Sequence, residues 1–210
     1  MGSGRVRTGA SRVPARPAVA WVVAALAVVT ELAACSNAGA SGAPIPAAVV
    51  ASGADCLAPQ VLDQLGLTLD PSLAATATHT AAPAAGRVPD GFVPTSVLVC
   101  QVGGQMRDSA GSWTAVTATS REGSAADVSA VVAALTRSAG ASAPAPASSC
   151  APGDPRLVLW LLDAMDRAVL PHLVPDACGG LDAAVRSAVD RLPATGEVDH
   201  PVQLVTPARS

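Results

Sequence analysis

The residues best suited to covalent chemistry in this sequence are its five cysteines. Cys35 directly follows Leu32, Ala33 and Ala34, and the others lie far apart along the chain: Cys56, Cys100, Cys150 and Cys178. The position of Cys35 at the end of an apolar run favours a modification of that thiol alone. The even number of cysteines after it favours disulfide bonds formed in an oxidising compartment.

The four later cysteines permit three pairings, and the sequence alone does not choose among them. We favour the sequential pairs Cys56–Cys100 and Cys150–Cys178, each of which would stabilise the fold by about 3.5–4 kcal/mol in the chain-entropy model. A metal site is disfavoured because there is no Cys-x-x-Cys motif and because His79, His172 and His200 lack ligand spacing. We therefore expect neither a metal nor another cofactor, and no thioredoxin-like activity.

The segment before Cys35 has the three parts of a secretory signal. Four arginines come first, at Arg5, Arg7, Arg12 and Arg16. The apolar run from Pro17 to Thr30 follows. It is shorter than the about 20 residues that span a bilayer, so a retained transmembrane helix is the weaker interpretation. Leu32 to Cys35 then resembles a bacterial lipobox, in which the cysteine receives diacylglycerol before cleavage.

The lipobox predicts that residues 1–34 are a lipoprotein signal peptide and that lipid, including palmitate, is attached to Cys35. The lipid bilayer would then be a partner, and the protein would lie on the outer face of the cytoplasmic membrane. Glu31 departs from the pattern, which prefers an uncharged residue there. The alternative is ordinary cleavage after Ala34 or further on, which gives a secreted protein. Residues 35–54 are small and uncharged and are predicted to be a flexible tether.

The charged and aromatic residues exclude several classes of protein. All 13 basic residues are arginine, so a P-loop lysine, a Schiff-base lysine and a Ser-x-x-Lys pair are excluded. After Cys35 the acidic residues outnumber the arginines, so we expect no binding to nucleic acid. Trp113 and Trp160 could stack on a sugar. With one Phe and no Tyr in the chain, however, core packing is their expected role.

Side chains that could support hydrolysis are present but form no recognised motif. There is no Gly-x-Ser-x-Gly sequence, and His172 is interpreted as a surface or turn histidine. Glycosidic chemistry needs two carboxylates, for which the candidates are Asp163 with Asp166 and Asp176 with Asp182. The first pair is interpreted as turn acids, and Asp182 as an acid that complements a helix dipole. No catalytic residue is therefore assigned.

Helices are predicted at residues 59–65, 124–137 and 181–192, where apolar residues recur at helical spacing or Pro and Gly mark the ends. Strands are predicted at 92–102 and 113–120, which form a hairpin, and at 156–162 and 168–173, which are joined by a turn at 163–167. Loops are predicted at 71–87 and 138–149. The apolar run 156–162 could instead be a helix, and we favour the strand.

The predicted elements define an α+β fold, with a small antiparallel sheet, helices on one face and disulfides that staple it. Ser124 and Asp127 approximate a capping box for the middle helix. Residues 55–193 are predicted to form a single domain, and residues 194–210 are interpreted as a loose C-terminal tail.

Residues 88–178 resemble a group of uncharacterised actinobacterial exported proteins and lipoproteins. The resembling motifs are Pro89-Asp90-Gly91-Phe92, Val97-Leu98-Val99-Cys100, Trp113 at a strand start, Leu157 to Asp163, and Val174 to Gly179. The sequence departs from the group at Asp163–Asp166, where a glycine would be expected in the turn. The resemblance implies an extracytoplasmic domain with disulfides and implies no activity.

Two classes of function follow from these observations. The first is a membrane-anchored, non-catalytic lipoprotein that binds a protein partner, a cell-wall polymer or a small ligand. The second is an extracytoplasmic hydrolase whose site is not evident from the sequence. A pocket with converging Asp, His and Ser side chains would favour the hydrolase, whereas an exposed apolar surface would favour the binding protein.

Overall fold

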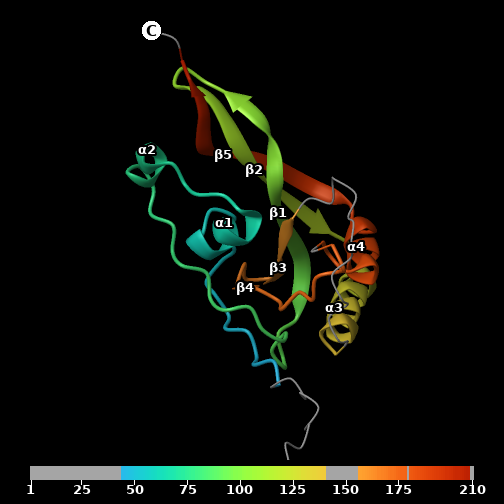
Figure 1. Ribbon diagram of the computed structural model, residues 1–210. Helices are drawn as coiled ribbons and strands as arrows, with labels where there is room; N and C mark the ends of the chain where they lie inside the picture. Colours follow the sequence, from blue (N-terminus) through green and yellow to red (C-terminus); the bar gives the residue numbers. More distant parts are fainter. Residues whose placement is uncertain (1–43, 141–155, 179, 209–210) are drawn as a thin grey trace, which may run out of the picture. The chain divides into compact units, whose positions relative to one another are not determined.

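The computed structural model describes residues 44–140, 156–178 and 180–208, all in one compact unit. The elements are, in order, α1 (Pro59–Leu65), α2 (Pro71–Ala74), β1 (Pro94–Arg107), β2 (Gly111–Glu122), α3 (Ala125–Ala139), β3 (Leu157–Asp163), β4 (Ala168–Val169), α4 (Ala183–Asp190) and β5 (Ala194–Pro207). These strands form one sheet in the order β4-β3-β1-β2-β5, and every neighbouring pair is antiparallel (Figure 1). The predicted α+β class is confirmed. The predicted signal peptide, Cys35, Cys150 and most of the predicted loop 138–149 lie outside the described residues.

The central hairpin of β1 and β2 is longer than its sequence pattern indicates. Residues 103–107 lie between the two predicted strands, but they belong to β1. Asp108 sets the short turn, because its carboxylate accepts hydrogen bonds from the backbone N–H groups of Ala110 and Gly111 and from the Trp113 indole. These donors, with the Trp113 indole first, hold the pKa of Asp108 below its ordinary value. Polar and glycine residues therefore extend the sheet here because a neighbouring strand satisfies their backbone groups.

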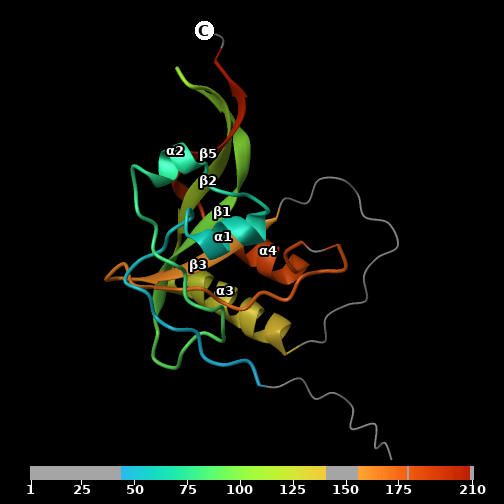
Figure 2. The same ribbon diagram turned by 60° about the vertical axis from the view of Figure 1, so that its left-hand side comes forward.

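The interpretation of residues 194–210 as a loose tail is wrong, because residues 194–207 form β5. This strand pairs along β2 from Gly111 with Pro207 to Arg121 with Ala194 (Figure 2). Among its side chains only Val202 is buried, and residues 194–199 are exposed on both faces. Pro201 and the register shifts further obscure a regular alternation. The alternation of apolar and polar residues that would indicate a strand is therefore weak here, because backbone hydrogen bonds hold this edge strand more than side-chain burial does.

The predicted tether 35–54 is also too long. Residues 35–43 lie outside the described part, but residues 44–54 pack against the domain. Ala48 is buried, and its backbone N–H donates to the carbonyl of Arg87. Ala51 exchanges backbone hydrogen bonds with Ala168 of β4. Small residues suit this packing as well as they suit a flexible linker, so composition did not distinguish the two.

The apolar run 156–162 is a strand, as favoured, because it forms β3 beside β1. The turn after it is organised by the Asp163 carboxylate, which accepts hydrogen bonds from the backbone N–H groups of Met165 and Arg167. The same carboxylate forms an ion pair with the Arg167 guanidinium. Asp166 occupies the left-handed region with a φ of 58°, where a glycine was expected. The strand predicted at 168–173 is only two residues long in the structure.

Helices α3 and α4 lie side by side on one face of the sheet (Figure 1). The capping box of α3 is confirmed, since the Ser124 hydroxyl accepts from the Asp127 N–H and the Asp127 carboxylate accepts from the Ser124 N–H. The buried residues of these helices are Val128, Val131, Ala134 and Leu135 of α3 and Val185, Ala188 and Val189 of α4. They pack on aliphatic side chains of β1 and β3, which gives the larger of the two layers of the core.

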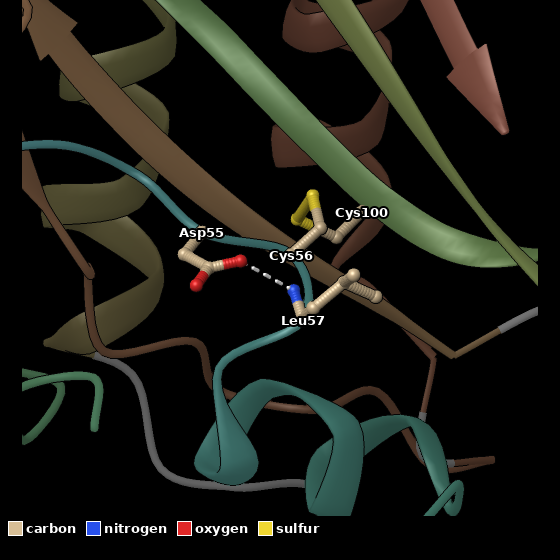
Figure 3. Close-up of a disulfide and its surroundings, with 4 residues drawn as sticks. All are labelled: Asp55, Cys56, Leu57 and Cys100. Carbon is tan, nitrogen blue, oxygen red and sulfur yellow. Dashed lines mark hydrogen bonds between the residues drawn. A yellow bond between two sulfur atoms is a disulfide. The ribbon is translucent and has the colours of Figure 1, made fainter. Parts of the chain in front are cut away.

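The opposite face of the sheet is covered by α1 and the segment before it. Val61, Leu62 and Leu65 of α1 are buried against Cys100, Trp160 and Val202 of the sheet. The predicted Cys56–Cys100 disulfide is present, with its Cα atoms 5.5 Å apart, and it fixes the start of this layer to β1 (Figure 3). Cys178 is also in a disulfide, but its predicted partner Cys150 lies outside the described residues. The pair Cys150–Cys178 stays a prediction.

Candidate functional site

The four carboxylates considered for glycosidic chemistry lie in turns or at the start of a helix. Asp163 is held by its own turn, and Asp166 lies in the same turn with an exposed side chain. Asp176 accepts hydrogen bonds from the backbone of Cys178 and Gly180. Asp182 is the N-cap of α4 and accepts from two backbone N–H groups of the first turn. The turn and helix roles expected for Asp163, Asp166 and Asp182 are therefore confirmed.

The two tryptophans of the described chain are core residues, as expected. Trp113 is buried, and its indole N–H donates to Asp108 at 2.9 Å. Trp160 is buried in the centre of β3. His172 is exposed in the loop after β4, and its backbone N–H donates to the carbonyl of Gly86. The interpretation of His172 as a turn residue is consistent with this position.

A pocket of about 480 Å³ lies between α1, the segment 67–69 and the chain that leaves α2. Its lining residues are Leu57, Pro59, Leu62, Asp63, Leu67, Thr68, Leu69, Ala74, Ala77, Thr78 and His79. Most of these side chains are aliphatic, and the polar ones are few. Ligand pockets usually have about 300–1,000 Å³ and the same mixture of apolar walls and a few polar groups. This cavity therefore has the size and lining of a small-molecule site.

Local sequence signals build the inner wall of the pocket. Pro59 starts α1 and Gly66 ends it in the left-handed conformation, with a φ of 74°. The Leu67 N–H donates back to the carbonyl of Leu62, so the chain turns sharply. This turn brings residues 67–69 beside the helix that they follow, and both contribute side chains to the pocket.

Three hydrogen-bonded contacts fix the outer wall. The Asp70 N–H donates to the carbonyl of Val202 in β5, and the Asp70 carboxylate caps α2 by accepting from Ser72. These Ser72 donors lower the pKa of Asp70 below its ordinary value. Further along, the Ala82 N–H donates to the side-chain carbonyl of Gln60 in α1 at 2.7 Å. The segment between α2 and residue 82 is therefore tied at both ends, although it contains no regular structure.

The third contact joins His79 to Asp55. The Nδ1 atom of His79 lies 2.8 Å from Oδ2 of Asp55, and the two side chains are 20 % and 36 % exposed. The other carboxylate oxygen of Asp55 accepts from the Leu57 N–H at 2.8 Å (Figure 3). Asp55 thus orients both the imidazole ring and the backbone beside Cys56. No sequence signal marked this pair, because the two residues are 24 positions apart and His79 lies in an Ala/Thr/Pro-rich loop.

A second, smaller cavity of about 70 Å³ lies beside this pair. Asp55 lines it together with Ser52, Gly53, Thr80 and the buried face of Trp160. Asp55 does not line the larger pocket, and His79 does not line the smaller cavity. The two residues of the pair thus border different spaces, His79 the larger pocket and Asp55 the smaller cavity.

The larger pocket has apolar walls and a few hydrogen-bonding groups at its rim. Among the described residues that line it, none is a serine or an arginine. Thr68 and Thr78 supply hydroxyl groups, Asp63 a carboxylate and His79 an imidazole held by Asp55. Within the described part of the chain, no group of three or more His, Cys, Asp or Glu side chains could hold a metal ion.

Comparison with known proteins finds no family model, no curated protein and no solved structure that matches this chain. In the described ranges, no helix combines the length and the apolar character needed to cross a membrane.

Proposed function

We propose that this chain is a lipid-anchored extracytoplasmic protein that binds a small apolar ligand in the pocket beside α1. The observation that carries the proposal is the cavity of about 480 Å³ with mainly aliphatic walls. Burial of apolar surface contributes about 25 cal/mol per Å², so such walls favour a ligand with a hydrocarbon portion. The lipobox at Cys35 and the even number of later cysteines support a location outside the cytoplasm.

The binding proposal is tested by filling the pocket from its exposed wall. Ala74 lines the pocket with an exposed side chain, whereas the neighbouring Ala75 is exposed and does not line it. Ala74→Trp should weaken binding of the fluorescent apolar probe phenylnaphthylamine by at least about tenfold, a loss of about 1.4 kcal/mol. Ala75→Trp is the matched control and should bind like the unmodified protein. Equal binding by both variants would contradict the assignment of the pocket.

The anchoring proposal is tested by the intact mass of the protein extracted from membranes. A mature protein that starts at Cys35 and carries diacylglycerol is expected. The Cys35→Ala variant should be released from the membrane because it has no thiol to modify. A mature N-terminus at another residue, or membrane retention of Cys35→Ala, would refute lipidation at this cysteine.

We propose hydrolysis as the second candidate function, because the Asp55–His79 pair has the arrangement of a base and the group that orients it. In this scheme His79 takes a proton from water, the resulting hydroxide attacks the carbonyl carbon of an acyl ester, and the protonated ring returns the proton to the leaving alcohol. The test is hydrolysis of nitrophenyl decanoate by the unmodified protein and by His79→Gln. A base of this type contributes about 10²–10⁴-fold, so equal rates would exclude the scheme.

A further inference from the structure

The hydrogen-bond partner of His79 determines which ring nitrogen can recognise a ligand. A carboxylate is an acceptor only, so Nδ1 of His79 must carry the proton that it donates to Asp55. In the neutral ring, Nε2 is then left as an acceptor. The Asp55 carboxylate therefore fixes the neutral tautomer as well as the orientation of the ring.

The two cavities show which residue of the pair borders the larger pocket. Asp55 lines only the smaller cavity, and His79 lines only the larger one. Because Nδ1 is hydrogen-bonded to Asp55, Nε2 is the ring nitrogen through which His79 can bind a molecule in the larger pocket. In the described part of the chain, Asp55 is the one side chain that bonds to this ring. The Nε2 acceptor thus remains available to a bound molecule.

The carboxylate of the lining, Asp63, has the same preference for a donor. Asp63 is exposed at the rim, and its carboxylate can accept hydrogen bonds but not donate them. No arginine is present among the described lining residues to receive an anion. A carboxylate or phosphate head group would meet the negative charge of Asp63 and a lone pair of His79. A hydroxyl or ammonium group would not be repelled by Asp63 and could donate to Nε2 of His79.

We propose that the ligand of this pocket is an amphiphile whose head group is a hydrogen-bond donor, either a hydroxyl or an amine, and not an acidic head group. This inference rests on the proposed function, since it requires an apolar molecule in the pocket. It adds the specificity of the site: Nε2 of His79 accepts from the head group, Asp63 excludes anions, and the aliphatic walls hold the hydrocarbon chain.

The experiment compares four probes that share one alkyl chain: decanol, decylamine, decyl methyl ether and decanoate. Each displaces phenylnaphthylamine from the Cys35→Ala protein at pH 8, so that no lipid of the protein itself competes. Decanol and decylamine should bind about two- to tenfold more tightly than the ether, which accepts but cannot donate, as expected for one hydrogen bond. Decanoate should bind most weakly.

Two variants assign the preference to its residues. His79→Phe keeps an aromatic ring without the acceptor, so its decanol and ether affinities should become equal. His172→Phe is the matched control and should keep the difference, because His172 lies outside this lining. Asp63→Asn should strengthen decanoate binding selectively, and it tests the head-group selection even if His79→Phe does not fold.

The outcomes separate this inference from the proposed function. Equal affinity of decanol and ether in the Cys35→Ala protein without further substitutions, or tightest binding of decanoate, would overturn the head-group inference and leave an apolar site in place. Failure of all four probes and of phenylnaphthylamine to bind would instead refute the proposed function.

Discussion

The Cys56–Cys100 disulfide should supply a large share of the stability of this domain. The two residues are 44 positions apart, and closing a loop of this size in the unfolded chain corresponds to about 4 kcal/mol in the chain-entropy model. The double variant Cys56→Ala/Cys100→Ala should therefore lose about 4 kcal/mol of unfolding free energy. For a domain of this size, this is a decrease of about 8–16 °C in the unfolding temperature.

Urea unfolding under oxidising conditions, followed by tryptophan fluorescence, measures this loss, because Trp113 and Trp160 are both buried. The matched control is the same pair of proteins in dithiothreitol. Neither protein then has the cross-link, so the two should unfold at nearly the same urea concentration. An oxidised difference below about 1 kcal/mol, or a difference that persists in dithiothreitol, would refute a stabilisation through the unfolded chain.

Three further predictions test the fold. Val202→Ala should lower the free energy of unfolding by about 1–3 kcal/mol, because this side chain is fully buried on β5. Val198→Ala is the control and should lower it by less than about 0.5 kcal/mol, because the Val198 side chain is 55 % exposed. Equal losses in urea unfolding would contradict the placement of β5. Ser124→Ala should lose about 1 kcal/mol through the α3 N-cap, and the exposed Ser109→Ala should be neutral in the same assay. Burial raises the pKa of Asp163, but the Arg167 guanidinium and the backbone donors outweigh it, so the folded pKa lies below the ordinary value. Its stabilisation is present above pH 4 and is lost as the pH falls through the folded pKa, so Asp163→Asn should flatten the acid limb of the stability profile, and an unchanged limb would contradict this assignment.

The elements that the sequence predicts correctly are those whose ends are marked by residues within or next to the element. Pro59 and Gly66 mark the ends of α1, and Ser124 with Asp127 marks the start of α3. The β1–β2 hairpin has an apolar, β-branched first strand and turn residues after it. In each of these cases the physical signal lies within a few residues of the element, so no tertiary information is needed to find it.

The features that the sequence does not predict depend on distant segments. β5 is defined by its pairing with β2, about 80 residues earlier in the chain, and its exposed side chains have no strict alternation. Residues 44–54 have the composition of a linker, but Ala48 and Ala51 pack because small residues permit a close approach to Arg87 and Ala168. Neither the composition nor the periodicity of a segment indicates such distant partners.

The pocket is the clearest example of a feature that only the folded chain reveals. Its outer wall is an Ala/Thr-rich segment with no helical or strand period, and it takes its position from Asp55 and Gln60. The sequence predicts the disulfide of Cys56, the residue next to Asp55, but it does not link this cysteine to a pocket. The structure supplies that reason, because the disulfide fixes the residue that orients His79.

Because Asp55 and Leu57 flank Cys56, the disulfide should affect ligand binding as well as stability. Cys56→Ala/Cys100→Ala releases the backbone between the residue that holds His79 and a residue that lines the pocket. Without urea, and at a temperature where the variant is fully folded, its affinity for decanol should fall. Its preference for decanol over the ether should shrink as well. Asp55→Asn tests the same link without touching the sulfur atoms: an amide can donate to Nδ1 and release the tautomer, so the preference should also shrink. If the disulfide variant lost affinity but kept the full preference, the cross-link would shape the apolar walls only, and Asp55 would hold the ring without its help.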